Sequence, residues 1–242
     1  MRPPRSGKGK WLRLGLAAGL IVLIVAVYFA LPFLRTRGVR LIRLRQWFDN
    51  PSAHPEWSVQ AGERCGEAPF LLPTDGYIGF TWGDSFRPGH SHQGIDIFGG
   101  QAPGQTPVVV AYSGYLSRLP EWKSSLIIRV PSDPLSSGRQ IWLYYTHLAD
   151  IAGNSYISPQ FPPGTSEQYV EAGTFLGYQD NYSGDPNNPT GIHLHFSIVL
   201  DDEQGSFRNE LKIANTLDPS PYLGLPLNAG EDPGALAVCG GD

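Results

Sequence analysis

The sequence has no excess of basic residues, few cysteines and no extended helical pattern after residue 62. Its 18 basic and 22 acidic residues give a formal net charge of −4. This balance argues against a general nucleic-acid-binding protein, which needs a basic surface. The absence of an internal repeat and of helical periodicity over ten or more residues argues against a repeat protein or a helical bundle.

The two cysteines, Cys65 and Cys239, lie near the two ends of the predicted globular part. Domain termini are often close together in space, so this pair can form a disulfide in an oxidising compartment. Two separate buried thiols are the alternative. The placement alone favours the disulfide.

Residues 14–34 contain no charged side chain. At about 1.5 Å per residue, a helix of this length spans roughly 30 Å, the thickness of the hydrocarbon core of a bilayer. We therefore predict a cytoplasmic basic tail at 1–13, a transmembrane anchor at 14–34 and a juxtamembrane linker at 35–62.

Two alternatives to the anchor are a buried soluble helix and a cleaved signal peptide. A signal peptide has a shorter apolar region of about 7–15 residues and a cleavage site with small residues. The segment PFLR at 32–35 offers no such site. Basic residues flank both ends of the apolar run about equally, so the positive-inside rule does not orient it.

Short β-branched and aromatic runs follow, bounded by turn-forming residues, at 108–111, 126–130, 141–145 and 193–200. The second and third runs are typical of two strands joined by a long hairpin loop. We predict a mainly β domain at 63–242, built on an antiparallel sheet. Its long loops at 149–173 and 179–191 are expected to form a groove.

His193 and His195 lie two residues apart in the last of these runs. Side chains alternate between the faces of a strand, so both imidazoles point the same way and Leu194 and Phe196 point into the core. A single buried histidine is usually a hydrogen-bonded core residue. Two on one face indicate a metal or catalytic site more strongly, because each needs a partner.

His92 and Asp96 form a second pattern, with Gly94 between them. Even spacing places both side chains on one face of an extended segment, and Gly94 lets an ion or another strand approach closely. A chance histidine beside a surface aspartate is the alternative. Together with His195, these residues supply three zinc ligands. A catalytic zinc usually has three protein ligands and an open fourth position, whereas a structural zinc has four.

Three motifs, HQGID at 92–96, YTHL at 145–148 and GIHLHF at 191–196, occur in the order found in the lysostaphin/LytM-type zinc endopeptidases, which hydrolyse peptidoglycan. The resemblance covers roughly residues 73–223, including NTLDP at 215–219. It implies that His92, Asp96 and His195 bind Zn²⁺ and that His147 and His193 flank the reaction centre. Ile192 departs from the proline or small residue common there. The loops after His147 and before His193 also differ in length.

The resemblance implies a zinc endopeptidase that cuts peptide cross-links of bacterial cell wall. Such a site belongs outside the cytoplasm, which places the N-terminus of the anchor inside. A non-catalytic module that binds wall peptides or activates another hydrolase is one alternative. A structural-zinc domain is another, and it needs His90 or His147 as a fourth ligand. Otherwise we expect His90 at the rim of the site.

His54 lies in the predicted linker, and we expect no catalytic role for it. Three tyrosines in or near the long loops are candidates for lining the groove, as loops commonly carry binding residues. They are Tyr156, Tyr178 and Tyr182.

Overall fold

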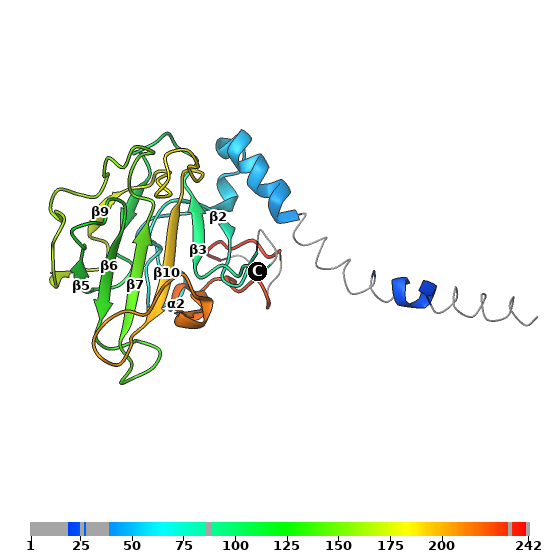
Figure 1. The fold of residues 1–242 in the computed structure, drawn as a ribbon. Coiled ribbons are helices and arrows are strands. Elements are labelled where there is room, and N and C mark those ends of the chain that lie inside the picture. Colours follow the sequence, from blue (N-terminus) through cyan, green and yellow to red (C-terminus); the bar gives the residue numbers. More distant parts are fainter. Residues whose placement is uncertain (1–18, 25–26, 28–38, 86–88, 232–233, 241–242) are drawn as a thin grey trace, which may run out of the picture.

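The structure is a computed structural model, and it describes residues 19–24, 27, 39–85, 89–231 and 234–240. The regular structure of the described chain is mainly antiparallel β-sheet, which confirms the predicted fold class of the domain (Figure 1). The main sheet has the strand order β1-β2-β3-β10-β7-β6-β5-β8, with β11 paired to β10. A smaller sheet pairs β4 with β9.

The strands are short and are separated by long connections. Their bounds are β1 Ser58–Val59, β2 Gly76–Phe80, β3 Ile95–Phe98, β4 Pro107–Val109, β5 Gly114–Ser117, β6 Leu126–Val130, β7 Ile141–Thr146, β8 Gln168–Val170, β9 Phe175–Tyr178, β10 Leu194–Leu200 and β11 Thr216–Leu217. The helical elements with defined bounds are η1 Pro51–Ala53, η2 Pro55–Trp57, η3 Ile213–Asn215 and α2 Ser220–Leu223.

Strand alternation separates the core face of the main sheet from an opposite face, which carries polar side chains near the start of β10 and a smaller hydrophobic cluster of Ile127, Trp142 and Val199. On β10, Leu194 and Phe196 are fully buried in the hydrophobic core, as the sequence predicts, and so is Ile198. The predicted hairpin also forms, because β6 and β7 pair in antiparallel register. The opposite face of β10 is therefore free to carry polar side chains.

Strand register fixes which polar side chains become neighbours. His195 on β10 lies opposite Asp96 on β3 and opposite Thr146 on β7, so the three residues form one row across the sheet. Gly94, just before β3, allows this approach: a Cβ there would lie 2.2 Å from the carbonyl oxygen of Phe196. The neighbouring strand, rather than an ion, occupies the space that Gly94 leaves.

The predicted transmembrane anchor falls largely outside the described residues. Residues 19–24 are helical, with exposed apolar side chains. No helix in the part of the chain that the structure describes combines the length and apolar character needed to span a bilayer.

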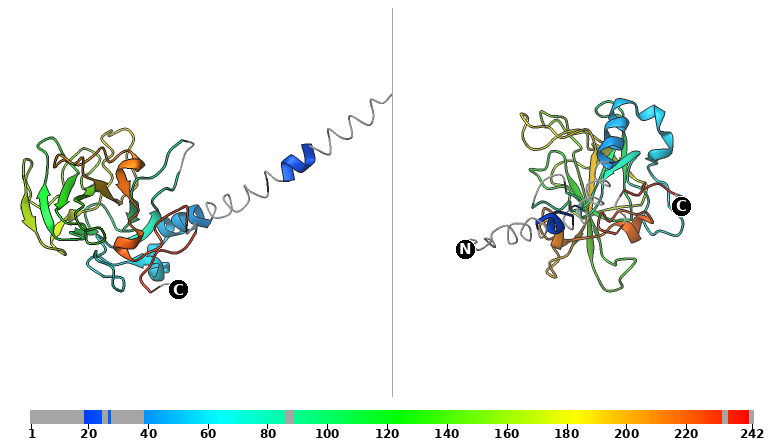
Figure 2. Two further views of the ribbon diagram at one scale, coloured as in Figure 1. Left: turned by 90° about the horizontal axis from the view of Figure 1, so that it is seen from below. Right: turned by 90° about the vertical axis from the view of Figure 1, so that its right-hand side faces the viewer.

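From residue 39 onward, the predicted linker contains regular structure. Residues 39–49 form a helix that lies beside β2 (Figures 1 and 2). Two short 3₁₀ turns follow, and β1 then pairs with β2 at the edge of the main sheet.

The two cysteines form the predicted disulfide. Cys65 and Cys239 are joined, with their Cα atoms 5.0 Å apart. The bond connects the start of the sheet domain to the C-terminal segment, and both residues pack at the hydrophobic core.

Candidate metal centre and cleft

Three segments bring the predicted metal ligands together. Asp96 lies on β3, His195 lies opposite it on β10, and His92 lies in the loop that leads into β3. His92 and Asp96 are buried, and His195 is partly buried at the floor of a cleft. Residues far apart in the sequence therefore meet at one point because two adjacent strands carry Asp96 and His195, and the loop before β3 carries His92.

The three ligand atoms are mutually close. His92 Nε2 lies 3.1 Å from Asp96 Oδ1 and 3.1 Å from His195 Nδ1. The distance from His195 Nδ1 to Asp96 Oδ1 is 2.9 Å. Zinc bonds to nitrogen and oxygen of about 2.0–2.2 Å give neighbouring atoms in a tetrahedron a separation of about 3.3 Å. The donor set therefore fits a single zinc ion.

A hydrogen bond to the backbone sets the orientation of the His92 ring. His92 Nδ1 lies 3.2 Å from the carbonyl oxygen of Thr81, so Nδ1–H donates to that oxygen and Nε2 keeps its lone pair. Such a partner fixes the tautomer and the direction of a metal-binding histidine. His92 thus directs an electron pair toward Asp96 and His195, as a metal ligand must.

Electrostatics keep Asp96 ionised. Burial by itself disfavours its carboxylate, but the charges of His92 and His193, together with hydrogen bonds from His193 and His195, outweigh burial and hold the pKa of Asp96 well below its usual range. Burial lowers the pKa of His195, which favours the neutral ring that a metal requires.

The other two predicted histidines lie beside these ligands. His193 Nδ1 lies 2.7 Å from the carbonyl oxygen of Gly191, and His147 Nδ1 lies 2.6 Å from that of Tyr182. In each ring Nδ1–H donates to the backbone, so proton exchange falls to Nε2, and Nε2 of His193 lies 3.5 Å from Asp96 Oδ1. The rings of His147 and His193 are adjacent, with centroids 4.5 Å apart.

His147 is held in a neutral state. Burial, followed by the neighbouring charge of His193, lowers its pKa to about 3. Its backbone has a φ of 72°, a left-handed conformation that is uncommon for residues other than glycine. Such conformations concentrate at functional sites, where the surrounding structure holds them.

Asp180 connects the backbones that carry these two histidines. Its N–H donates to the carbonyl oxygen of His147 at 2.7 Å, and its own carbonyl oxygen accepts from the N–H of His193 at 3.2 Å. Asp180 is itself buried. The predicted groove loop therefore fixes both residues through main-chain bonds.

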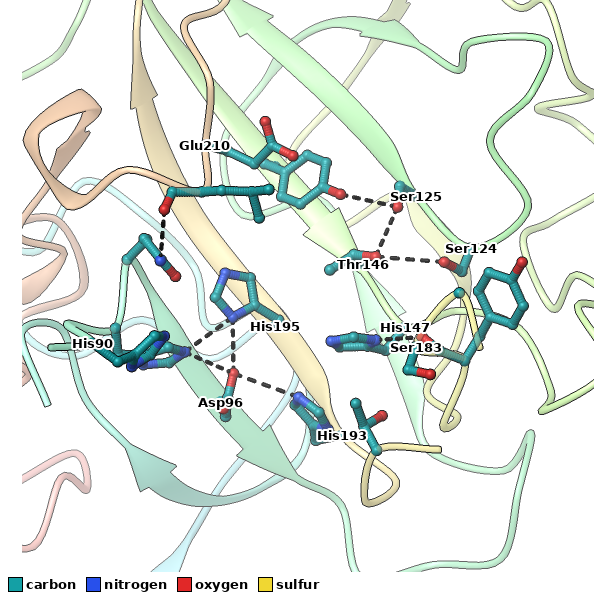
Figure 3. Close-up of a pocket in the computed structure, with 17 residues that line it drawn as sticks. His90, Asp96, Ser124, Ser125, Thr146, His147, Ser183, His193, His195 and Glu210 are labelled. Atoms are coloured by element: carbon teal, nitrogen blue, oxygen red, sulfur yellow. Dashed lines mark hydrogen bonds and ion pairs between the residues drawn. The ribbon is translucent and has the colours of Figure 1, made fainter. Parts of the chain in front are cut away.

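One cleft of about 460 Å³ is lined by all five predicted site residues, His92, Asp96, His147, His193 and His195. Figure 3 shows Asp96, His193 and His195 directed toward a common point, with His147 beside them. One wall carries linked hydroxyl groups: Ser125 Oγ lies 2.7 Å from Thr146 Oγ1 and accepts from Tyr144 at 3.1 Å. Glu210 adds a carboxylate to the lining.

The remaining predicted residues separate into cleft and non-cleft positions. His90 lines the cleft as a rim residue, and within the described chain it is not part of the close metal-binding group. His54 instead stacks on Trp57, with ring centroids 3.8 Å apart. Of the three candidate tyrosines, Tyr182 lines the cleft, whereas Tyr156 and Tyr178 are not among its lining residues.

Several residues that line or support the cleft are not evident from the sequence. Asp180 falls in a loop whose length predicted a groove, but nothing in its neighbourhood predicts the link between two histidines. Ser124, Ser125 and Glu210 reach the cleft only through the fold. Tyr144 and Thr146 also line the cleft, and only the alternation of side chains along β7 indicates that they lie on the same face of the sheet.

Comparison with known proteins gives structural similarities but no sequence match. No family model and no curated protein matches the chain. The catalytic domain of the antimicrobial peptidase lysostaphin from Staphylococcus simulans is 22% identical, with a TM-score of 0.39 over 62% of this chain and 90% of that domain. A catalytic-domain variant of the prophage-encoded M23 protein EnpA from Enterococcus faecalis is 20% identical, with a TM-score of 0.36 over 62% of this chain and 95% of that one. At these TM-scores, the family resemblance continues to rest on the sequence motifs.

Proposed function

We propose that the protein is a zinc-dependent endopeptidase that hydrolyses peptide cross-links of bacterial peptidoglycan. The observation that carries this proposal is the convergence of three ligand atoms from His92, Asp96 and His195 beside two further histidines in an open cleft. A structural zinc site has no need of two additional histidines whose Nδ1 atoms are held by backbone carbonyls, which leaves Nε2 for proton exchange. The substrate class follows from the resemblance of the three motifs to the lysostaphin/LytM-type peptidases.

His92, Asp96 and His195 are the residues that would hold the zinc ion. When bound there, zinc supplies Lewis-acid polarisation of the scissile carbonyl and lowers the pKa of water toward about 7. The charge of Asp96 offsets part of the charge of the cation, and the Thr81 carbonyl keeps the His92 ring in its ligating tautomer.

His147 and His193 supply the proton transfers that peptide hydrolysis requires. The attacking water loses a proton, and the leaving amine gains one. Because Nδ1–H of each ring donates to a backbone carbonyl, each Nε2 can accept a proton from the cleft and return it. The protonated ring then donates from Nε2 to a developing oxyanion or to the amine. His147 and His193 share the roles of general base and of donor to the oxyanion or the amine.

The cleft suits an extended peptide. Its wall of serine, threonine and tyrosine hydroxyls offers both donors and acceptors to a peptide backbone. The groove lies over the polar face of the sheet, and the 179–191 loop forms part of its rim through Tyr182, Ser183 and Gly184.

We also propose that residues 14–34 anchor the chain in the cell membrane, with the catalytic domain on the outer side. The uncharged length of that run supports a single span. The Cys65–Cys239 disulfide supports an oxidising compartment, where such bonds persist.

The test uses the full-length chain in mild detergent, with metal analysis and purified cell walls of defined cross-link chemistry. We expect about one zinc per chain and peptide fragments identifiable by mass spectrometry. Chelation should abolish release, and added zinc should restore it.

His195→Ala should lose both zinc and activity, whereas His54→Ala, a histidine substitution outside the cleft, should retain both. Full activity in His195→Ala would refute the zinc assignment. Undiminished binding of wall fragments without any cleavage would favour the non-catalytic module instead.

A further inference from the structure

The helix at 39–49 turns one side toward the sheet domain. Arg40, Leu44 and Trp47 are buried, at the i, i+4 and i+7 spacing of a single helix face. Leu44 and Trp47 pack in a cluster with Tyr77 of β2 and Phe98 of β3. Figures 1 and 2 show this helix beside β2 in different views. The helix is therefore packed against the strands that border the site.

Arg40 makes the polar contacts of this buried face. Its Nη1 donates to Asp84 Oδ2 at 2.6 Å and to Thr81 Oγ1 at 3.0 Å. Both charged side chains of this pair are only 10% exposed. A buried ion pair is strongly destabilised when one partner is removed, because the other charge is left unpaired. Arg40 thus holds residues 81–84, the turn that follows β2.

The same turn holds His92. The Thr81 carbonyl oxygen accepts from His92 Nδ1, and the Asp84 carbonyl oxygen accepts from the His92 N–H at 2.7 Å. In addition, the Gly83 N–H donates to the His92 carbonyl oxygen at 2.8 Å. Both the ring and the main chain of His92 are therefore fixed by the turn that Arg40 contacts.

We propose that Arg40 is a positioning residue for the metal site. By holding the side chains of Thr81 and Asp84, it fixes the turn whose carbonyl groups orient His92 toward Asp96 and His195. The proposal rests on the proposed function, since it assigns Arg40 to the support of that zinc ligand. It also makes the 39–49 helix part of the metal-binding unit, although its sequence predicts a linker.

This arrangement couples the site to the segment next to the predicted anchor. In the sequence, Arg40 lies six residues after the end of the predicted anchor at residue 34. A chain that begins at residue 63 lacks Arg40, so it should bind zinc more weakly than the full-length chain even where the sheet folds.

The test compares Arg40→Gln with the wild type in the full-length chain in detergent. Zinc affinity is measured by competition with a chromophoric chelator. The His92 Nδ1–H signal is followed by NMR in the zinc-free chain. Loss of a hydrogen-bonding partner behind a metal ligand typically lowers affinity by about 10–100-fold. We expect a loss of that size in Arg40→Gln, together with faster solvent exchange of the His92 ring proton.

Arg43→Gln is the matched control. Arg43 is on the same helix, and its Nη1 donates to the Gly234 carbonyl oxygen at 3.0 Å rather than to residues 81–84. It should keep wild-type zinc affinity and ring-proton exchange. If Arg40→Gln does not fold, Arg40→Lys replaces it. This variant keeps a positive charge near Asp84 but loses the planar donor group, and a smaller loss of affinity is expected.

An unchanged zinc affinity and an unchanged His92 signal in a folded Arg40 variant would overturn the positioning role. Equal losses in the Arg40 and Arg43 variants would overturn it as well, since they would indicate general destabilisation. A wild-type chain that binds no zinc would refute the proposed function. The ring-proton signal of the Arg40 variants would then still decide whether Arg40 positions His92.

Discussion

Replacing Gly94 by alanine should disturb the metal site through the backbone. A Cβ at this position would lie 2.2 Å from the Phe196 carbonyl oxygen and 2.8 Å from Ser197 Cβ. An ordinary contact needs about 3.4 Å, so the segment before β3 and strand β10 must separate by about 1 Å. Phe196 follows His195 directly, and this shift moves His195 relative to Asp96.

Overpacking of this kind costs about 1–3 kcal/mol of unfolding free energy. For a domain of this size, that loss corresponds to a fall in Tm of roughly 2–12 °C. A displacement of about 1 Å at a reaction centre can cost about 100-fold in rate. We therefore expect Gly94→Ala to show a modestly lower Tm and a much larger fall in kcat/KM, accompanied by weaker zinc binding.

Calorimetry, chelator competition and peptide release from purified walls measure these three effects. Gly191→Ala is the matched control: it is also near the site, but its added Cβ would meet only ordinary contacts, 3.6 Å from Phe98 and 3.8 Å from Phe48. Wild-type zinc affinity and activity in Gly94→Ala would refute the reasoning, because the strands would then tolerate the methyl group without moving the ligands.

Two further predictions concern the proton-transfer residues and the disulfide. His147→Ala should lower kcat by about 10²–10⁴-fold while zinc content stays at the wild-type level, since His147 is not a ligand; loss of zinc in that variant would contradict its assignment. The double variant Cys65→Ser/Cys239→Ser should lose about 5 kcal/mol of unfolding free energy, because the bond closes a loop with a sequence separation of 174. Calorimetry should then show a Tm lower by roughly 10–20 °C, and a fall of less than about 3 °C would show that the denatured chain is little constrained by the bond.

Local pattern was sufficient for the four strands β4, β6, β7 and β10 and for the face of β10 that His195 occupies. The alternation in β10 separates Leu194 and Phe196, in the core, from His195, in the cleft. The even spacing of His92 and Asp96 predicted that their side chains lie together, and they do, although His92 precedes β3 rather than lying within it. Periodicity is a property of neighbouring residues, so the sequence displays it directly.

Contacts between segments that are distant in the sequence could not be predicted from such local patterns. The Arg40–Asp84 pair joins residues 44 positions apart, and the bonds of Asp180 to the His147 and His193 backbones involve no sequence motif. A main-chain hydrogen bond does not require a particular side chain. In the sequence, Arg40 is only one of several basic residues that follow the predicted anchor, and its buried partner becomes its neighbour only through folding.

The backbone supports of the proposed metal ligands differ from those of the proposed proton-transfer histidines, although His193 Nε2 itself lies 3.5 Å from Asp96 Oδ1. Sheet register holds Asp96 and His195, and the 81–84 turn holds His92. His147 and His193, in contrast, are oriented by carbonyl oxygens of Tyr182 and Gly191, both in the 179–191 loop. Changes in that loop can therefore alter proton transfer and the shape of the groove while the zinc ligands keep their places, whereas changes in the 39–49 helix act first on His92.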